Sequence, residues 1–251
     1  MKKLLIVSGK GGTGKTTTAA SFAALSAAEA VADCDVDAPN LHLILQPGKP
    51  ERQTTFFGGV RAAVDPARCT GCGACMARCA FDAVRMVDGA ARVDAYACEG
   101  CGVCAYVCAH DAITLHDDAA GMLYLYRDAA GVFSTAQLRM GRGNSGKLVS
   151  EVKMQMQREA PEAALAVIDG APGIGCPVIA SAGGADLVLI VAEASNSGYS
   201  DMQRLVQTMR MFDVPLAVCV NRWDVNAGWT QQIEAFCARE RIAFVGRVPY
   251  D

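Results

Sequence analysis

Eight cysteines in the middle of the chain repeat one spacing, Cys-x2-Cys-x2-Cys-x3-Cys, twice. The copies are Cys69, Cys72, Cys75 and Cys79, and Cys98, Cys101, Cys104 and Cys108. The similarity continues past the cysteines, because residues 69–84 align with residues 98–113 at a constant offset. Closely spaced thiols in a chain without a secretion signal indicate metal ligation rather than disulfides. The repeat therefore predicts a small duplicated module that binds metal.

The spacing also predicts which metal group is bound. One tight loop supplies three thiolates to one face of a 4Fe–4S cube, and in the bacterial ferredoxin pattern the fourth ligand comes from the other copy. We therefore expect two clusters, one on Cys69, Cys72, Cys75 and Cys108, and one on Cys98, Cys101, Cys104 and Cys79. Alanine follows each fourth cysteine, at Ala80 and Ala109, where that pattern has proline. Zinc, the alternative metal, usually takes its ligands as two separated pairs.

Outside the cysteine repeat, short apolar runs alternate with segments compatible with helices. The apolar runs are residues 4–7, 164–168, 187–192, 216–220 and 243–248, and the helical segments are 16–30, 199–212 and 231–239. This alternation predicts an α/β fold with a parallel sheet and helices on both faces. Residues 123–128 and 131–138 could form a hairpin.

A phosphate-binding loop follows the first apolar run. Residues 9–16 fit G-x-x-x-x-G-K-[ST] and lie between a predicted strand and a predicted helix, as the motif requires. Glycines let successive backbone N–H groups face phosphate oxygens, and the helix N-terminus adds a positive dipole. Lys15 is expected to contact the β- and γ-phosphates, and the Thr16 hydroxyl to ligate magnesium.

Further motifs resemble one class of P-loop ATPases. Lys10, in the segment KGGTGKTT, resembles the signature lysine of the MinD/ParA/nitrogenase-iron-protein class. Residues 33–41 and 169–173 are similar to the first and second switches of that class, and Asn221 and Arg222 follow a strand where the class reads adenine. Including residues 144–149, the resemblance covers essentially the whole chain.

The resemblance implies a nucleotide site shared between two subunits. Lys10 would reach the phosphates of a partner subunit and stabilise transition-state charge, so a homodimer or a heterodimer with a related ATPase is expected. The residues expected to contact ATP are Gly9, Lys10, Gly11, Gly12, Thr13, Gly14, Lys15, Thr16, Thr17, Asn221 and Arg222.

Three aspartates follow the first switch strand, and one begins the second switch. We expect Asp169 to bind magnesium together with Thr16, and Asp35 to position or activate water. Asp33 and Asp37 remain alternatives to Asp35, since all three lie at the carboxyl end of a predicted strand beside the phosphate loop. Lys10, Lys15, Asp35 and Asp169 form the expected catalytic set.

These features divide the chain into an ATPase domain and an insert. We expect residues 1–59 and 119–251 to form the P-loop ATPase domain, and residues 60–118 to form an inserted α+β ferredoxin-like domain. The 251 residues, 52% of them hydrophobic, are enough for one α/β domain and a small insert.

Charge and hydropathy exclude other classes. A net charge of -3 and the lack of a basic cluster argue against nucleic-acid binding. The basic N-terminus has too few apolar residues for a signal peptide, and the run 187–192 is too short to span a bilayer. The sequence therefore predicts a cytoplasmic protein that does not bind membranes.

As a whole, the chain resembles MinD-superfamily P-loop ATPases that contain an inserted ferredoxin domain. This predicts an ATP-hydrolysing iron–sulfur protein that couples nucleotide state to electron transfer, with an unidentified redox partner. The first alternative is an assembly or carrier ATPase for iron–sulfur or other metal cofactors, but no Cys-x-x-Cys pair of the kind such carriers use follows Asn221. The second is a MinD-like spatial organiser, which needs a membrane-binding or DNA-binding element that the sequence does not show.

Overall fold

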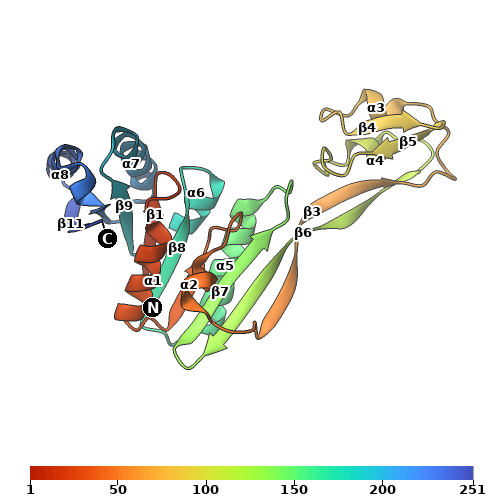
Figure 1. Ribbon diagram of the computed structural model, residues 1–251. Helices are drawn as coiled ribbons and strands as arrows, with labels where there is room; N and C mark the ends of the chain where they lie inside the picture. The colour runs from red at the N-terminus through yellow and green to blue at the C-terminus, as the bar shows by residue number, and fades with distance from the viewer. Residues whose placement is uncertain (251) are drawn as a thin grey trace. The chain divides into compact units, whose positions relative to one another are not determined.

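The structure, a computed structural model, describes residues 1–250, which fall into two compact units. The first unit contains Met1–Thr54, Met122–Leu138 and the chain from Ser145 onward, and the second contains Thr55–Gly121 and Arg139–Asn144. The second unit thus begins before residue 60 and ends its first segment after residue 118, and it also takes a short segment that the sequence assigned to the ATPase domain. Figure 1 labels the elements of both units.

The large sheet has the strand order β11-β10-β9-β1-β8-β2-β7-β6-β3, and β3 and β6 continue from the first unit into the second. Its strands are β1 (Lys2–Ser8), β2 (Ala30–Asp33), β3 (Arg52–Val64), β6 (Ile113–Asp128), β7 (Gly131–Leu138), β8 (Leu165–Pro172), β9 (Leu187–Glu193), β10 (Leu216–Asn221) and β11 (Ala243–Val248). Neighbouring strands from β11 to β7 pair in parallel. The predicted α/β fold with a mostly parallel sheet is confirmed.

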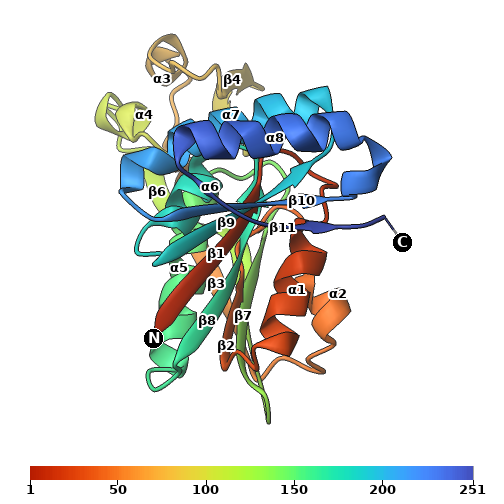
Figure 2. The same ribbon diagram turned by 90° about the vertical axis from the view of Figure 1, so that its left-hand side faces the viewer.

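Helices cover both faces of this sheet (Figure 2). One face carries α1 (Lys15–Leu25) and α2 (Leu41–Leu45), and the other carries α5 (Ser145–Glu159), α6 (Cys176–Ala182), α7 (Asn196–Met209) and α8 (Ala227–Glu240). Short 3-10 turns at Arg210–Phe212 and Trp223–Val225 follow α7 and β10. Ala19, Ala20 and Ala23 of α1 are buried on the sheet, where their small side chains let the helix backbone lie close to it.

The helix predicted over residues 16–30 extended too far at its C-terminal end. Helix α1 stops at Leu25, Ala27 has a left-handed φ of 49°, and the N–H of Ala28 donates to the carbonyl of Ala23. Ala30 then begins β2, a fully buried strand between β7 and β8. Alanine has a high helix propensity, but burial of β2 between β7 and β8 overrides that propensity. The strand ends at Asp33 and so places this residue in the site.

The second unit repeats its own structure. Helix α3 (Ala74–Ala77) and helix α4 (Val103–Tyr106) begin 29 residues apart, from 74 to 103, and each follows a left-handed glycine. Strands β4 (Val84–Val87) and β5 (Ala90–Val93) form an antiparallel ribbon. Buried Ala62, Val84, Ala91 and Ile113 form a core around which the cysteines pack. The sequence repeat is therefore also a repeat of structure.

Candidate functional site

The candidate nucleotide site lies at the carboxyl ends of the parallel strands. Strand β1 ends at Ser8 and α1 begins at Lys15, so the phosphate-binding loop forms the turn between them. Gly14 has a φ of 89°, and a Cβ at this position would lie 2.2 Å from Nδ2 of Asn221. Glycine is favoured at this turn because its left-handed backbone strains any other residue, and a side chain would also displace the Asn221 amide.

Lys15 and Asp169 form a buried ion pair beneath the loop. Nζ of Lys15 lies 2.5 Å from Oδ1 of Asp169 and 3.4 Å from Oγ1 of Thr16, and the two charged side chains are 6% and 0% exposed. The second carboxylate oxygen, Oδ2, is buried and lacks a hydrogen-bond partner among the described residues. Burial raises the pKa of Asp169, and the Lys15 ammonium offsets part of that rise. The structure thus brings together the three side chains predicted to bind phosphate and magnesium.

Asp33 is fixed by the backbone of the first switch. Its Oδ1 accepts from the N–H of Asp35 at 3.0 Å, and its Oδ2 accepts from the N–H groups of Asn40 and Leu41 at 3.1 and 3.0 Å. Burial, followed by the charge of Asp169 on the neighbouring strand, raises the pKa of Asp33 to about 7. These contacts give Asp33 a structural role in holding the switch.

The other two aspartates of the switch are less engaged. Asp35 is half-buried, and burial raises its pKa, while Asp37 is exposed. The Lys15 charge and a backbone hydrogen bond from Ala38 offset part of the rise in the Asp35 pKa. The action of Asp35 on water stays a prediction.

Lys10 is held within its own chain. Its Nζ lies 2.5 Å from Oε2 of Glu193, at the end of β9, and 3.0 Å from Oγ of Ser197 in α7, and the side chain is a third exposed. These partners could not be predicted from the sequence, because both are far from Lys10 along the chain. The contact of Lys10 with a partner subunit's phosphates stays a prediction.

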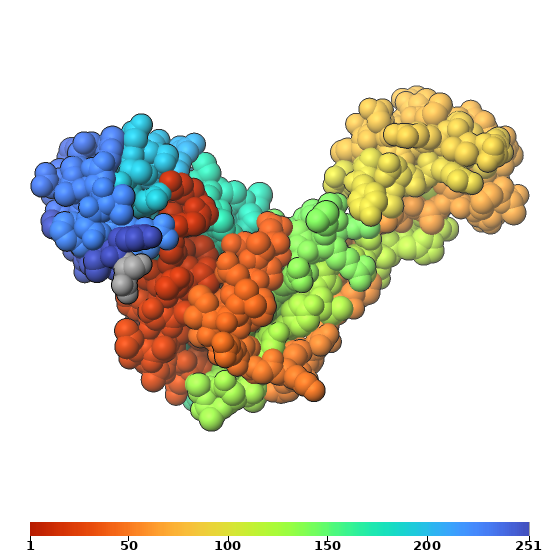
Figure 3. Space-filling model, viewed as in Figure 1, coloured from red at the N-terminus to blue at the C-terminus, as the bar shows by residue number. Residues whose placement is uncertain are grey.

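Asn221 joins the end of β10 to the phosphate-binding loop. Its Nδ2 donates to the carbonyl of Thr13 at 2.8 Å, and Arg222 follows with a left-handed φ of 52°. Beside them lies a cavity of about 510 Å³, large enough for a small ligand. It is lined by Gly14, Thr17, Thr18, Ser21, Phe22, Leu25, Ser26, Asn221 and Val248. In the space-filling view of the first unit, residues near the N-terminus (red) lie against the blue C-terminal segment (Figure 3).

The apolar wall of this cavity was not predicted from the sequence. Phe22 and Leu25 lie three residues apart on α1, and they are 40% and 90% exposed. Large apolar side chains on the solvent side of a helix are the signal that could have identified them, since ligand pockets are lined mainly by apolar and aromatic side chains.

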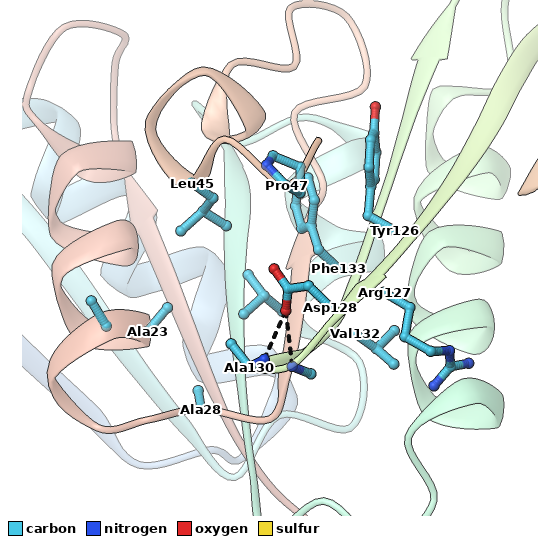
Figure 4. Close-up of a pocket in the computed structure, with 13 residues that line it drawn as sticks. Ala23, Ala28, Leu45, Pro47, Tyr126, Arg127, Asp128, Ala130, Val132 and Phe133 are labelled. Carbon is cyan, nitrogen blue, oxygen red and sulfur yellow. Dashed lines mark hydrogen bonds between the residues drawn. The ribbon is translucent and has the colours of Figure 1, made fainter. Parts of the chain in front are cut away.

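The first unit has a second, apolar cavity. It has a volume of about 210 Å³ and is lined by α1, the α2 region and the β6–β7 hairpin (Figure 4). The carboxylate of Asp128 is used by the hairpin turn, where it accepts from the N–H groups of Ala130 and Gly131, and Arg127 pairs with Glu51. The hairpin expected from residues 123–128 and 131–138 is present.

The two predicted four-cysteine sets each line one cavity of the second unit. One cavity is lined by Cys69, Cys72, Cys75 and Cys108, and the other by Cys79, Cys98, Cys101 and Cys104. Within residues 1–250, no three His, Cys, Asp or Glu side chains come close enough to hold a single metal ion. A four-iron cube is larger than one ion, so its thiolates stand farther apart than the ligands of a mononuclear site.

Backbone N–H groups point at several of these sulfurs. Ala83 donates to Sγ of Cys79 and Ala112 to Sγ of Cys108, both at 3.3 Å, so this bond recurs in both copies. The N–H of Ala91 donates to Sγ of Cys69 at 3.4 Å, and this bond lowers the pKa of the Cys69 thiol. Donors of this kind stabilise thiolates and are found around iron–sulfur clusters, where they tune the reduction potential.

Glycine is required where the two cysteine-bearing loops turn. Gly71 has a φ of 69°, and its Cβ would lie 2.3 Å from the carbonyl oxygen of Gly89. Its counterpart Gly100 has a φ of 67°, and its Cβ would lie 2.0 Å from the carbonyl oxygen of Val60. Both loops therefore pass against a neighbouring backbone with no space for a side chain.

No helix within residues 1–250 combines the length and apolar character needed to cross a membrane.

Comparison with known proteins places the chain among nucleotide-binding domains. Residues 4–251 match the CobQ/CobB/MinD/ParA nucleotide binding domain, CbiA. Uncharacterized protein MJ0578 of Methanocaldococcus jannaschii is 35% identical over 228 residues, which are 89% of this chain and 79% of that protein.

Two solved structures show the same fold at low sequence identity. MinD of Pyrococcus horikoshii OT3, complexed with Mg-ADP, has a TM-score of 0.57 and 15% identity, over 100% of this chain and 82% of its own. A variant of Cyanothece McdA in complex with ATP has a TM-score of 0.55 and 18% identity, over 100% of this chain and 84% of its own.

Proposed function

The chain belongs to the CobQ/CobB/MinD/ParA nucleotide-binding domain family, and from that premise we propose that it binds and hydrolyses MgATP. The buried Lys15–Asp169 pair beside Thr16 carries this proposal. A cation and a carboxylate held together under a glycine loop are the groups that phosphate and magnesium require. The Mg-ADP and ATP bound by the two similar structures agree with this choice of ligand.

Each side chain of the site has a distinct role in the proposal. Lys15 binds the phosphates and Thr16 and Asp169 hold magnesium, which supplies positive charge against the phosphate oxygens when it is bound. The orphaned Oδ2 of Asp169 fits this role, because a buried carboxylate oxygen without a partner is available to such an ion. Asp35 orients the attacking water, and Lys10 acts across a dimer interface after it leaves Glu193.

We further propose that the second unit holds two 4Fe–4S clusters. The four cysteines around each cavity supply the ligands, and the N–H groups of Ala83, Ala91 and Ala112 donate hydrogen bonds to three of the sulfurs. When bound, such clusters take up and release single electrons. Apolar residues pack around six of the cysteines while Cys72 and Cys101 are exposed, and solvent access is one determinant of cluster potential.

The combined proposal is a cytoplasmic ATPase whose nucleotide state is coupled to electron transfer with a redox partner. An assembly factor for metal cofactors is the first alternative, and it would use the same cysteines as a transfer site. A spatial organiser like MinD is the second alternative, and the likeness to MinD and McdA structures is compatible with it. The two four-cysteine cavities favour the redox role, because spatial organisation gives them no task.

One experiment separates these functions. ATP turnover is measured on anaerobically purified protein with its clusters oxidised and then reduced, while EPR follows the clusters. A redox-coupled ATPase changes its turnover with cluster oxidation state. A transfer factor instead releases its iron to an apo-acceptor protein, and an organiser turns over ATP at one rate in both states.

A further inference from the structure

The ammonium of Lys153 is buried in the first unit without a carboxylate. The side chain is 6% exposed and belongs to α5. Its Nζ donates to the carbonyl oxygens of Ala180, Ser181 and Gly183 at 2.9, 2.7 and 2.6 Å. These three bonds use every N–H of the ammonium group.

The three carbonyls mark the end of the helix that follows the second switch. Residues 169–173 lead directly into α6, which ends at Ala182. The last carbonyls of a helix have no partner within the helix, and they carry its negative dipole end. Lys153 therefore satisfies these carbonyls and neutralises their partial charge, and in doing so it holds the far end of α6 against α5.

Helix α5 also approaches the near end of α6 closely. A Cβ at Gly146, in the first turn of α5, would lie 3.3 Å from the carbonyl oxygen of Cys176, which begins α6. Helix α5 thus lies against both the first and the last turn of α6. Gly146 lies in the segment 144–149, for which the sequence suggested no role.

The first switch also interacts with Lys153 and α6, through Cys34. Cys34 lies between Asp33 and Asp35, is fully buried, and donates its N–H to the carbonyl of Asp169 at 2.8 Å. The Cys34 thiol interacts electrostatically with the Lys153 ammonium and forms a hydrogen bond with the Ser181 side chain. Lys153 is thus a buried side chain that contacts the helix behind one switch and interacts electrostatically with the buried Cys34 thiol of the other.

We propose that Lys153 is a positioning residue for ATP hydrolysis, which rests on the proposed ATPase function. It fixes α6 so that residues 169–173 present Asp169 to the nucleotide in one geometry. It touches neither the loop nor Asp169, so it acts through α6 and not on the reacting atoms. Helix α5 also begins directly after Asn144, the last residue of the second unit, so it is the element on which the chain returns from the cysteine unit.

The test compares Lys153→Met with Lys153→Arg and with Arg158→Met, an exposed cation on the same helix. Lys153→Met keeps the length of the side chain and removes all three donors. We expect kcat for ATP to fall about tenfold or more, since small displacements of positioned groups are costly, while KM for MgATP stays within about twofold. Lys153→Arg restores much of kcat, and Arg158→Met leaves kcat unchanged.

The outcomes separate the inference from the proposed function. An unchanged kcat in a folded Lys153→Met protein overturns the positioning role, and so does an equal loss in Arg158→Met. If Lys153→Met does not fold, Gly146→Ala is used, since it places a methyl group against Cys176 at the other end of the same contact, and an unchanged kcat then overturns the inference. A wild-type protein that hydrolyses no ATP overturns the proposed function, and the role of Lys153 falls with it.

Discussion

Nζ of Lys15 and Oδ1 of Asp169 lie 2.5 Å apart, on the first turn of α1 and the middle of β8, and both side chains are buried. The pair joins the phosphate-binding loop to the second switch through one charge interaction. A buried charge that loses its partner is strongly destabilising, so each residue constrains the other. Nucleotide binding must redistribute this interaction, because phosphate and magnesium attract the same two groups.

Lys15→Ala is expected to abolish measurable MgATP binding and to lower the free energy of unfolding by about 3 to 5 kcal/mol, because it leaves the Asp169 carboxylate buried and unpaired. Isothermal calorimetry and chemical denaturation measure the two effects. The double variant Lys15→Ala/Asp169→Asn should regain much of the stability and none of the binding. Equal stability of the two variants would mean that the pair is not coupled.

Lys10→Ala is expected to keep MgATP affinity and to lose hydrolysis by about a thousandfold or more, because its proposed target is the phosphate of a partner subunit. Sedimentation with a non-hydrolysable ATP analogue should show a wild-type dimer and a variant monomer. Lys49→Ala, which removes an exposed lysine outside the site, is the control. A wild-type protein that stays monomeric with nucleotide bound would contradict the shared site.

Cys72→Ser and Cys101→Ser are each expected to remove one of two clusters, so that anaerobic protein falls from about eight irons per chain to about four. Each serine removes one thiolate from a different cavity. Iron and sulfide analysis with EPR checks this result, and Cys176→Ser, at an exposed cysteine outside both sets, should keep all the iron. Zinc alone after anaerobic reconstitution would contradict the ligand assignment.

Asp33 should make the protein less stable as the pH rises. Its pKa is about 7 in the folded state and 3.8 ordinarily, so between these values the native state holds a proton that the unfolded state has released. Stability then falls with increasing pH from about 4 to about 7, by at most about 1.4 kcal/mol per pH unit for this one group. Denaturation of wild type and Asp33→Asn across this range measures the slope, and an equal slope in both proteins would show that Asp33 does not titrate there.

Much of the candidate nucleotide site could be predicted from the sequence because each of its parts is a short local pattern. The loop from Gly9 to Thr16 needs one turn between a strand and a helix, and Asp169 and Asn221 each come at the end of an apolar run. In a parallel sheet such ends meet at one edge, so local patterns were enough to bring these residues together. The cysteine sets were predictable for the same reason, since a fixed spacing places three ligands in one loop.

Contacts between distant segments could not be predicted. Glu193 holds Lys10, and Lys153 holds α6, yet neither residue has a motif around it. Lys153 follows the apolar Val152 on a helix, where a lysine usually faces solvent, and only the fold shows that it is buried. The start of β2 at Ala30 was missed because alanine has no strand signal, and burial between β7 and β8 determined its conformation.

The central claim is that one chain holds MgATP and two clusters and couples them. An EPR-monitored redox titration with and without MgATP tests it directly. Since linkage is reciprocal, a coupling of about 1 to 3 kcal/mol should shift the midpoint potential by about 45 to 130 mV and change ATP affinity on cluster reduction by the same free energy. The same midpoint potential and the same ATP affinity in both states, or no cluster signal at all, would contradict the claim.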